Sequence, residues 1–247
     1  MKNVITTKEL ECNEKNSKFV YTDEICVCCG NTSLPNDMLC KACKDKVDEE
    51  KEKKMTNKEE FLELCKCNIS RDGIEDLLAW LEKSDFYSAP ASTKYHGCNE
   101  GGLLEHSLNV YKALLDLVAL YKLDVDVETL TIVSLFHDLC KVNFYKKATR
   151  NVKDEHGKWI EKTVYEIDEK FPCGEHADKS IILIQQYMKL TPNEILAIRA
   201  HMGGFDTSVK GGSFMVGKIF EKSPLALCLH LADMVATYLY EAKHNDT

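Results

Sequence analysis

Apolar residues recur with helical spacing along most of the chain after its first quarter. One such set repeats every three or four residues and therefore lies on one face of a helix. Its members are Leu103, His106, Val110, Leu114 and Leu117. A second apolar run of helical length, 130–136, ends at an adjacent His137 and Asp138, with Lys141 three residues further on.

Capping signals predict where several helices begin. Thr56–Glu59 resembles a helix-start box, and Thr191-Pro192 combines an N-cap with proline at the first helical position. Ser223-Pro224 is expected to start the last long helix. The glycine- and serine-containing stretch from Gly203 to Gly217 is expected to be a loop.

The residue pattern changes from helical to strand-like between residues 143 and 168. Residues 143–150 and 158–168 are rich in β-branched and aromatic residues, and 154–157 reads as a turn, so a β-hairpin inserted into a helical domain is predicted. Lys146 and Arg150 lie among aromatic residues there, a mixture that can pair with phosphates and stack on bases. Acidic residues dilute this charge, and an ordinary solvated hairpin fits the pattern equally well.

Metal-competent side chains stand inside the apolar helices. Burying an imidazole or a carboxylate without a polar partner costs free energy, so such groups need compensation. A divalent ion provides it, because imidazole nitrogen and carboxylate oxygen are common metal ligands. A single histidine is more often a core residue, but the recurrence favours a metal. The candidates are His106, His137, Asp138, His176, His201 and Asp233.

The order of these residues resembles the HD-domain superfamily of metal-dependent phosphohydrolases. The resemblance covers roughly Ser84 to Tyr240, with Gly-Gly-Leu-Leu-Glu-His, His-Asp-x-x-Lys and Leu-Ala-Asp-Met as its motifs. Within the superfamily the chain is most similar to the HD domain of bacterial 3′-to-5′ exoribonucleases. The resemblance implies an all-α fold, an HD-domain helical bundle into which the hairpin is inserted.

The resemblance also implies a ligand set for one or two ions, which could be Mn, Mg, Co, Ni, Fe or Zn. Asp138 would bridge to a second ion held by His176 and His201. The first ion would be held by His106, His137, Asp138 and Asp233. Some HD phosphodiesterases carry two adjacent histidines where this chain has His201-Met202, so one candidate ligand of the second ion is absent.

Two further residues are candidates for contact with substrate. Lys141 follows Asp138 by three residues, so it lies on the same side of the helix and could reach a phosphate oxygen. Asp138 and Lys141 are therefore the catalytic candidates. His230 precedes Asp233 by three residues and could orient it or touch substrate, although a core position is equally expected.

The cysteines predict a second metal site. Twelve cysteines in a chain without an export signal indicate metal binding rather than disulfides. The pairs Cys26-x-x-Cys29 and Cys40-x-x-Cys43 match a structural, tetrahedral zinc site. We therefore expect a zinc-ribbon-like module with a charged linker at 1–52 and an HD phosphohydrolase domain at 53–247, the module folding only with its ion.

Composition restricts the partners. The net charge of −8 provides no general attraction for nucleic acid, so a small anionic substrate or a short strand end is expected. The sequence shows no signal peptide or membrane-spanning stretch, which predicts a cytoplasmic protein without membrane contact.

The expected function is metal-dependent hydrolysis of a nucleotide or short-RNA phosphate ester. The alternative is an adaptor whose zinc module contacts nucleic acid or protein, and whose HD site only senses nucleotide. Turnover of a nucleotide panel by the purified protein would separate the two.

Overall fold

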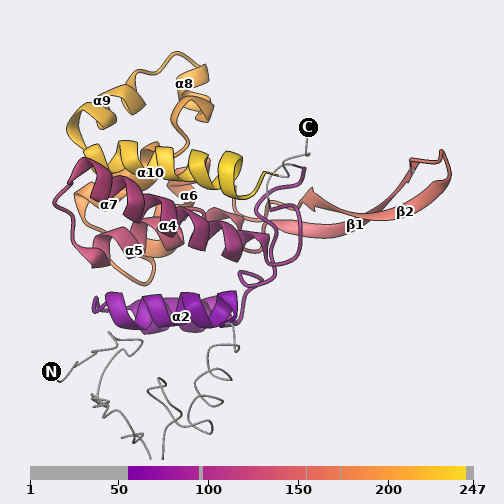
Figure 1. Ribbon diagram of the computed structural model, residues 1–247, viewed down its shortest axis with the longest axis horizontal. Helices are drawn as coiled ribbons and strands as arrows, with labels where there is room; N and C mark the ends of the chain where they lie inside the picture. Colours follow the sequence, from indigo (N-terminus) through magenta and orange to yellow (C-terminus); the bar gives the residue numbers. More distant parts are fainter. Residues whose placement is uncertain (1–54, 95–96, 154, 173, 243–247) are drawn as a thin grey trace, which may run out of the picture. The chain divides into compact units, whose positions relative to one another are not determined.

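The computed structural model describes residues 55–94, 97–153, 155–172 and 174–242 (Figure 1). Within these ranges the regular secondary structure consists of helices and one two-stranded sheet. The elements are α2 (Asn57–Asn68), α3 (Ile74–Glu82), α4 (Gly102–Tyr121), α5 (Val127–Phe136), η1 (Leu139–Lys141), β1 (Tyr145–Lys153), β2 (Trp159–Ile167), α6 (His176–Gln185), α7 (Pro192–Ala200), η2 (Gly203–Phe205), α8 (Thr207–Lys210), α9 (Met215–Lys222), α10 (Pro224–Val235) and the π-helix η3 (Ala236–Tyr240).

This arrangement confirms a helical fold with an inserted hairpin for the described part of the chain. The predicted zinc module lies outside the described residues, with all four of its ligand candidates. These are Cys26, Cys29, Cys40 and Cys43.

The helices pack around α4, α5, α7 and α10. Helix α10 packs against α4 and α7, and α4 also packs against α5, so these helices lie side by side (Figure 1). Helix α2 packs across α4 and α5, while α6 contacts η1 and α7. The ends of α5 and α7 and the start of α6 lie close to the first turns of α4 and the last turns of α10.

Aromatic side chains occupy the interior beneath α2. Phe61, Phe86 and Phe136 are almost completely buried. The ring centroid of Phe61 lies 5.0 Å from that of Phe86 and 5.8 Å from that of Phe136. Burying one such side chain contributes about 2–3 kcal/mol, so this cluster fixes α2 on the bundle.

Side-chain caps confirm two of the predicted helix starts. Thr191 accepts a hydrogen bond from the backbone N–H of Glu194, whose carboxylate accepts one from the backbone of Thr191. Ser223 caps α10 in the same way, and Pro224 occupies the first position of that helix. Both helices begin where the sequence predicted because these contacts are local.

The prediction of a loop from Gly203 to Gly217 was wrong. This stretch contains η2, α8 and the start of α9. Asp206 caps α8 by accepting from the backbone N–H of Ser208 (2.8 Å), and it also pairs with Arg199. Burial raises the pKa of Asp206, but the hydrogen bonds from Ser208 and Arg199 outweigh it and hold the pKa below its ordinary value.

A buried ion pair ties the connection before α3 to α7. The carboxylate of Glu194 is completely buried and accepts from both terminal nitrogens of Arg71, at 2.7 and 3.0 Å. Thr129 adds a hydrogen bond to the same carboxylate (3.0 Å). The bidentate geometry compensates a charge that would be costly to bury alone.

The hairpin extends away from the helices (Figure 1). Its strands pair antiparallel from Tyr145 opposite Ile167 to Lys153 opposite Trp159. Strand β1 runs to Lys153, three residues beyond the predicted end at Arg150. No helix in the described ranges is long and apolar enough to cross a membrane.

Candidate metal centre

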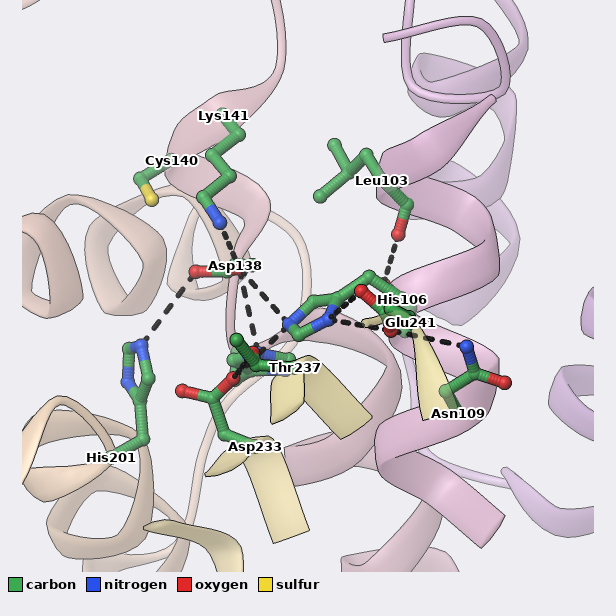
Figure 2. A network of polar contacts seen from close by, with 12 residues as sticks. Leu103, His106, Asn109, Asp138, Cys140, Lys141, His201, Asp233, Thr237 and Glu241 are labelled. Carbon is green, nitrogen blue, oxygen red and sulfur yellow. Dashed lines mark hydrogen bonds and ion pairs between the residues drawn. The ribbon is translucent and has the colours of Figure 1, made fainter. Parts of the chain in front are cut away.

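Four histidines and two aspartates from five helices form overlapping groups of candidate metal ligands in the bundle. Figure 2 shows His106, Asp138, His201 and Asp233 of this cluster. Helix α4 supplies His106 and α10 supplies Asp233, each from within a packed helix. The others sit at helix ends. His137 and Asp138 follow α5, His176 opens α6, and His201 closes α7.

Asp138 lies at the middle of the cluster, and its two carboxylate oxygens face different partners (Figure 2). Oδ2 lies 2.5 Å from Nζ of Lys141, 3.5 Å from Nε2 of His137 and 3.6 Å from Nε2 of His106. Oδ1 lies 2.7 Å from Nε2 of His176 and 3.6 Å from Nε2 of His201. The carboxylate therefore divides the cluster into two sides.

Backbone carbonyls fix the orientation of two of these rings. Nδ1 of His137 donates to the carbonyl of Ser134 (2.8 Å), and Nδ1 of His201 donates to the carbonyl of Ile198 (2.6 Å). A carbonyl only accepts, so the proton of each neutral ring is on Nδ1 and the lone pair of Nε2 faces the cluster. Carbonyls in the last turn of a helix have few intrahelical partners, which lets both helix ends hold a ring this way, although the carbonyl of Ile198 also accepts from the backbone N–H of His201 (3.4 Å).

The geometry fits a metal ion. The Nε2 atoms of His137 and His201 are buried and make no hydrogen bond within the described residues. Two ligand atoms bound to one ion at about 2.1 Å lie roughly 3–3.5 Å apart, close to the 3.3–3.6 Å between several of these atoms. Buried polar atoms without hydrogen bonds at this spacing are what a divalent ion would satisfy.

A carboxylate outside the predicted set holds His106. Oε1 of Glu241 lies 3.0 Å from Nδ1 of His106 and also accepts from the side chain of Asn109 (3.0 Å). Nε2 of His106 faces Oδ1 of Asp233 at 3.3 Å. The π-helix η3, closed by the bond from the N–H of Glu241 to the carbonyl of Ala236 (3.0 Å), brings Glu241 to the side of α10 that carries Asp233.

Charges within the cluster shift the pKa values of its members. Burial lowers the pKa of His137 to about 4, so this ring is neutral at pH 7 and can bind an ion without losing a proton. Burial also lowers the pKa of His106, but hydrogen bonds to Asp233 and Glu241 outweigh it and raise the pKa to about 9. The acidic partners thus favour positive charge at His106, from a proton or an ion.

The two aspartates are ionised for similar reasons. Burial raises the pKa of Asp138, but Lys141 and His137 outweigh it and hold the pKa well below its ordinary value. Burial also raises the pKa of Asp233, but the hydrogen bond from His106 outweighs it and holds the pKa below its ordinary value. Two anionic carboxylates beside imidazole nitrogens are a suitable ligand set for a dication.

The cluster is closed on most sides. The side chains of His106, His137 and His201 are fully buried, whereas those of His176 and Asp233 are 30% and 18% exposed. Solvent therefore reaches the cluster beside His176 and Asp233, and a substrate would have to approach there.

The structure brings the six predicted metal ligands and Lys141 together. It does not place the remaining substrate-binding candidates in the cluster. Lys146 and Arg150 are exposed on β1, where Arg150 pairs with Glu166 (3.1 Å). His230 packs behind His201, donating from Nδ1 to its carbonyl (2.7 Å) and stacking on Phe220.

Glycine is required where His230 packs. Gly203 has φ +52°, and a Cβ there would lie 2.3 Å from the ring of His230. Gly203 therefore lets η2 pass close to His230 just after His201.

Sequence reasoning missed Glu241 and Cys140. Glu241 follows Asp233 by eight residues, and an α-helix would place it on a different face. Cys140 stands within the His-Asp-x-x-Lys motif, and its thiol lies 3.2 Å from both ring nitrogens of His176. Its position beside a metal-binding motif was a usable signal.

The fold and the cluster define a helical protein with a buried site whose histidines and aspartates could hold a divalent metal ion. The HD domain family matches residues 103–238, more than half of the 247-residue chain, and the chain belongs to this family. HD domains are generally metal-dependent phosphohydrolases. No curated protein and no solved structure matches the chain.

Proposed function

We propose that this chain hydrolyses a phosphate ester of a nucleotide or a short RNA, using one or two divalent ions bound at the cluster. The observation that supports it best is the buried convergence on Asp138, where the Nε2 atoms of His137 and His201 make no hydrogen bond to any described residue. A bound ion would lower the pKa of a water molecule, so that hydroxide is available near neutral pH, and it would neutralise charge on the phosphoryl oxygens.

The division of partners around Asp138 supports two ion positions. His106, His137 and Asp233 would hold the first ion together with Oδ2 of Asp138. His176 and His201 would hold the second with Oδ1. The carbonyls that orient His137 and His201 keep their lone pairs aimed at these positions without any rearrangement.

Lys141 is proposed to bind a phosphate oxygen. Burial lowers its pKa, but Asp138 outweighs this and raises the pKa above its ordinary value, so the ammonium group stays charged. Its position beside Asp138 would put that charge next to the phosphoryl group, where charge builds during hydrolysis.

The substrate class rests on charge and access. A net charge of −8 repels long polyanions, and His176 and Asp233 are the most exposed of the candidate ligands within the described residues. A nucleotide or a strand end fits these conditions, in line with the resemblance to the HD domain of exoribonucleases. Lys146 and Arg150 on the hairpin would then contact more distant parts of the substrate.

Metal-free full-length protein tests the proposal when it is supplied with Mn²⁺, Mg²⁺, Co²⁺ or Ni²⁺ and a panel of nucleotides and short RNAs. We expect ion-dependent turnover, and we expect Asp138→Asn to lose bound ion and turnover together. Asp116→Asn, the same change at an exposed position of α4, is the control. Ion binding without turnover on any substrate would favour the nucleotide-sensing adaptor instead.

The zinc module is a separate proposal. We infer from spacing alone that Cys26, Cys29, Cys40 and Cys43 hold one structural zinc, and that the module contacts nucleic acid or protein. Elemental analysis of the full chain should find one zinc fewer after Cys26→Ser with Cys29→Ser. Equal zinc content would contradict the site.

A further inference from the structure

Cys140 lies on the side of Asp138 that faces His176. Its Sγ is 3.2 Å from each ring nitrogen of His176, and Nε2 of His176 is 2.7 Å from Oδ1 of Asp138. One ligand atom from each of these three residues lies within 4.8 Å of the others. Cys140 is only 3% exposed, and its backbone N–H donates to Oγ of Ser180 (3.0 Å), which fixes η1 against α6.

A second observation points to a ligand at the same place. Nε2 of His201 faces the same Oδ1 of Asp138 at 3.6 Å, is completely buried and makes no hydrogen bond within the described residues. The carbonyl of Ile198 holds the proton of this ring on Nδ1, so a lone pair is directed toward Oδ1. The ligand atoms of Asp138, Cys140 and His176 form one group and those of His137, Asp138 and His201 another, so nitrogen, oxygen and sulfur donors meet at the carboxylate of Asp138.

We infer that the second ion position is a mixed nitrogen, oxygen and sulfur site in which Sγ of Cys140 binds the ion directly, beside His176 and Asp138. This inference rests on the proposed function, since it presupposes an ion at the cluster. Sulfur and nitrogen bound to one tetrahedral ion lie roughly 3.5 Å apart, near the 3.2 Å found here. As the sulfur–metal bond forms, the thiol proton leaves to solvent, and the thiolate charge offsets one charge of the dication.

Sulfur ligation would make the two ion positions chemically different. A thiolate favours Zn²⁺, Cd²⁺ and Co²⁺ over Mg²⁺ and Mn²⁺, which prefer oxygen ligands. The position defined by His106, His137 and Asp233 has only nitrogen and oxygen donors. The cluster would then bind a thiophilic ion on one side of Asp138 while the other side accepts harder ions.

Cobalt(II) titration of the full-length protein tests the inference, because a thiolate bound to Co²⁺ gives a charge-transfer band in the near ultraviolet. We expect Cys140→Ser to lose the intensity of one thiolate and to bind Cd²⁺ at this position roughly tenfold more weakly or worse. Cys228→Ser is the matched control, since Cys228 is 4% exposed on α10 and lies outside the three groups of candidate ligands. Cysteines of the predicted zinc module contribute equally to all three proteins and cancel in the difference spectra.

Cadmium-113 NMR of the wild type keeps the test independent of how the variants fold. A resonance in the range for a single sulfur ligand, separate from the tetrathiolate range, would support the inference. Ions bound at the cluster with only nitrogen and oxygen ligands, and identical cobalt spectra for wild type and Cys140→Ser, would overturn it while leaving the proposed function intact. A cluster that binds no ion would overturn both.

Discussion

Replacing Glu241 with glutamine tests whether this carboxylate orients a metal ligand. Oε1 lies 3.0 Å from Nδ1 of His106 and 3.0 Å from the side-chain nitrogen of Asn109. Glu241→Gln preserves the size of the side chain and leaves an oxygen that can still accept from His106, but it removes the negative charge. The charge is the part that strengthens an imidazole as a ligand.

The expected loss follows from this geometry. Removing an outer partner of a metal-bound histidine weakens metal binding about 10–100-fold, or about 1.4–2.7 kcal/mol. Because glutamine retains one hydrogen bond, Glu241→Gln should weaken metal binding about tenfold, and Glu241→Ala about a hundredfold.

The loss of metal affinity in Glu241→Gln should grow with pH. Burial lowers the pKa of His106, and hydrogen bonds to Asp233 and Glu241 raise it to about 9, so in the wild type a proton competes with the ion at pH 7. Glu241→Gln lowers that pKa and relieves the competition, which partly hides the loss at pH 7. As pH rises toward 9 the competition weakens in both proteins, and more of the difference should emerge.

Calorimetric titration of Mn²⁺ into metal-free protein at about pH 7 and about pH 8.5 measures this effect. Glu105→Gln is the control, because Glu105 is exposed on α4 beside His106 and the substitution makes the same change in net charge. The reasoning is refuted if the two variants bind Mn²⁺ within about twofold of each other at both pH values.

Three further outcomes are expected. Arg71→Met leaves the buried carboxylate of Glu194 without its cation and should lower the free energy of unfolding by about 3 kcal/mol, and a loss under about 1 kcal/mol in urea denaturation would contradict this. The pKa of Asp206 is lower in the folded protein than in the unfolded chain, where it is near 4. Its contribution to stability is therefore present above the unfolded pKa and is lost as the pH falls through the folded pKa. The urea midpoints of wild type and Asp206→Asn should converge at low pH. Lys141→Ala should slow turnover about a hundredfold while retaining bound ion, whereas loss of ion would show that Lys141 is structural.

The sequence by itself predicted much of the local structure. Helical spacing and caps located α7 and α10 because Thr191 and Ser223 bond to backbone groups three residues away. The change to β-rich composition located the hairpin, although β1 extends past Arg150. The prediction of a loop after Gly203 was wrong because it overlooked Asp206, which caps α8 within a stretch of glycines and serines.

The six ligand candidates came from recurrence and from the order of motifs, and neither contains distances. Only the packing of α4, α6, α7 and α10 around the end of α5 decided that Oδ1 and Oδ2 of Asp138 face different histidines. The sequence likewise could not decide that Lys146 and Arg150 lie exposed on a hairpin that extends from the bundle (Figure 1).

Glu241 and Cys140 show why tertiary structure was needed. Helical periodicity puts a residue eight positions after Asp233 roughly 80° around an α-helix, and the wider π-turn at Ala236–Tyr240 corrects that angle. Cys140 meets His176 across 36 residues of sequence through the packing of η1 on α6. Periodicity and capping act within a few residues and can be read along the chain, whereas contacts between helices depend on how side chains from distant segments fill the same space.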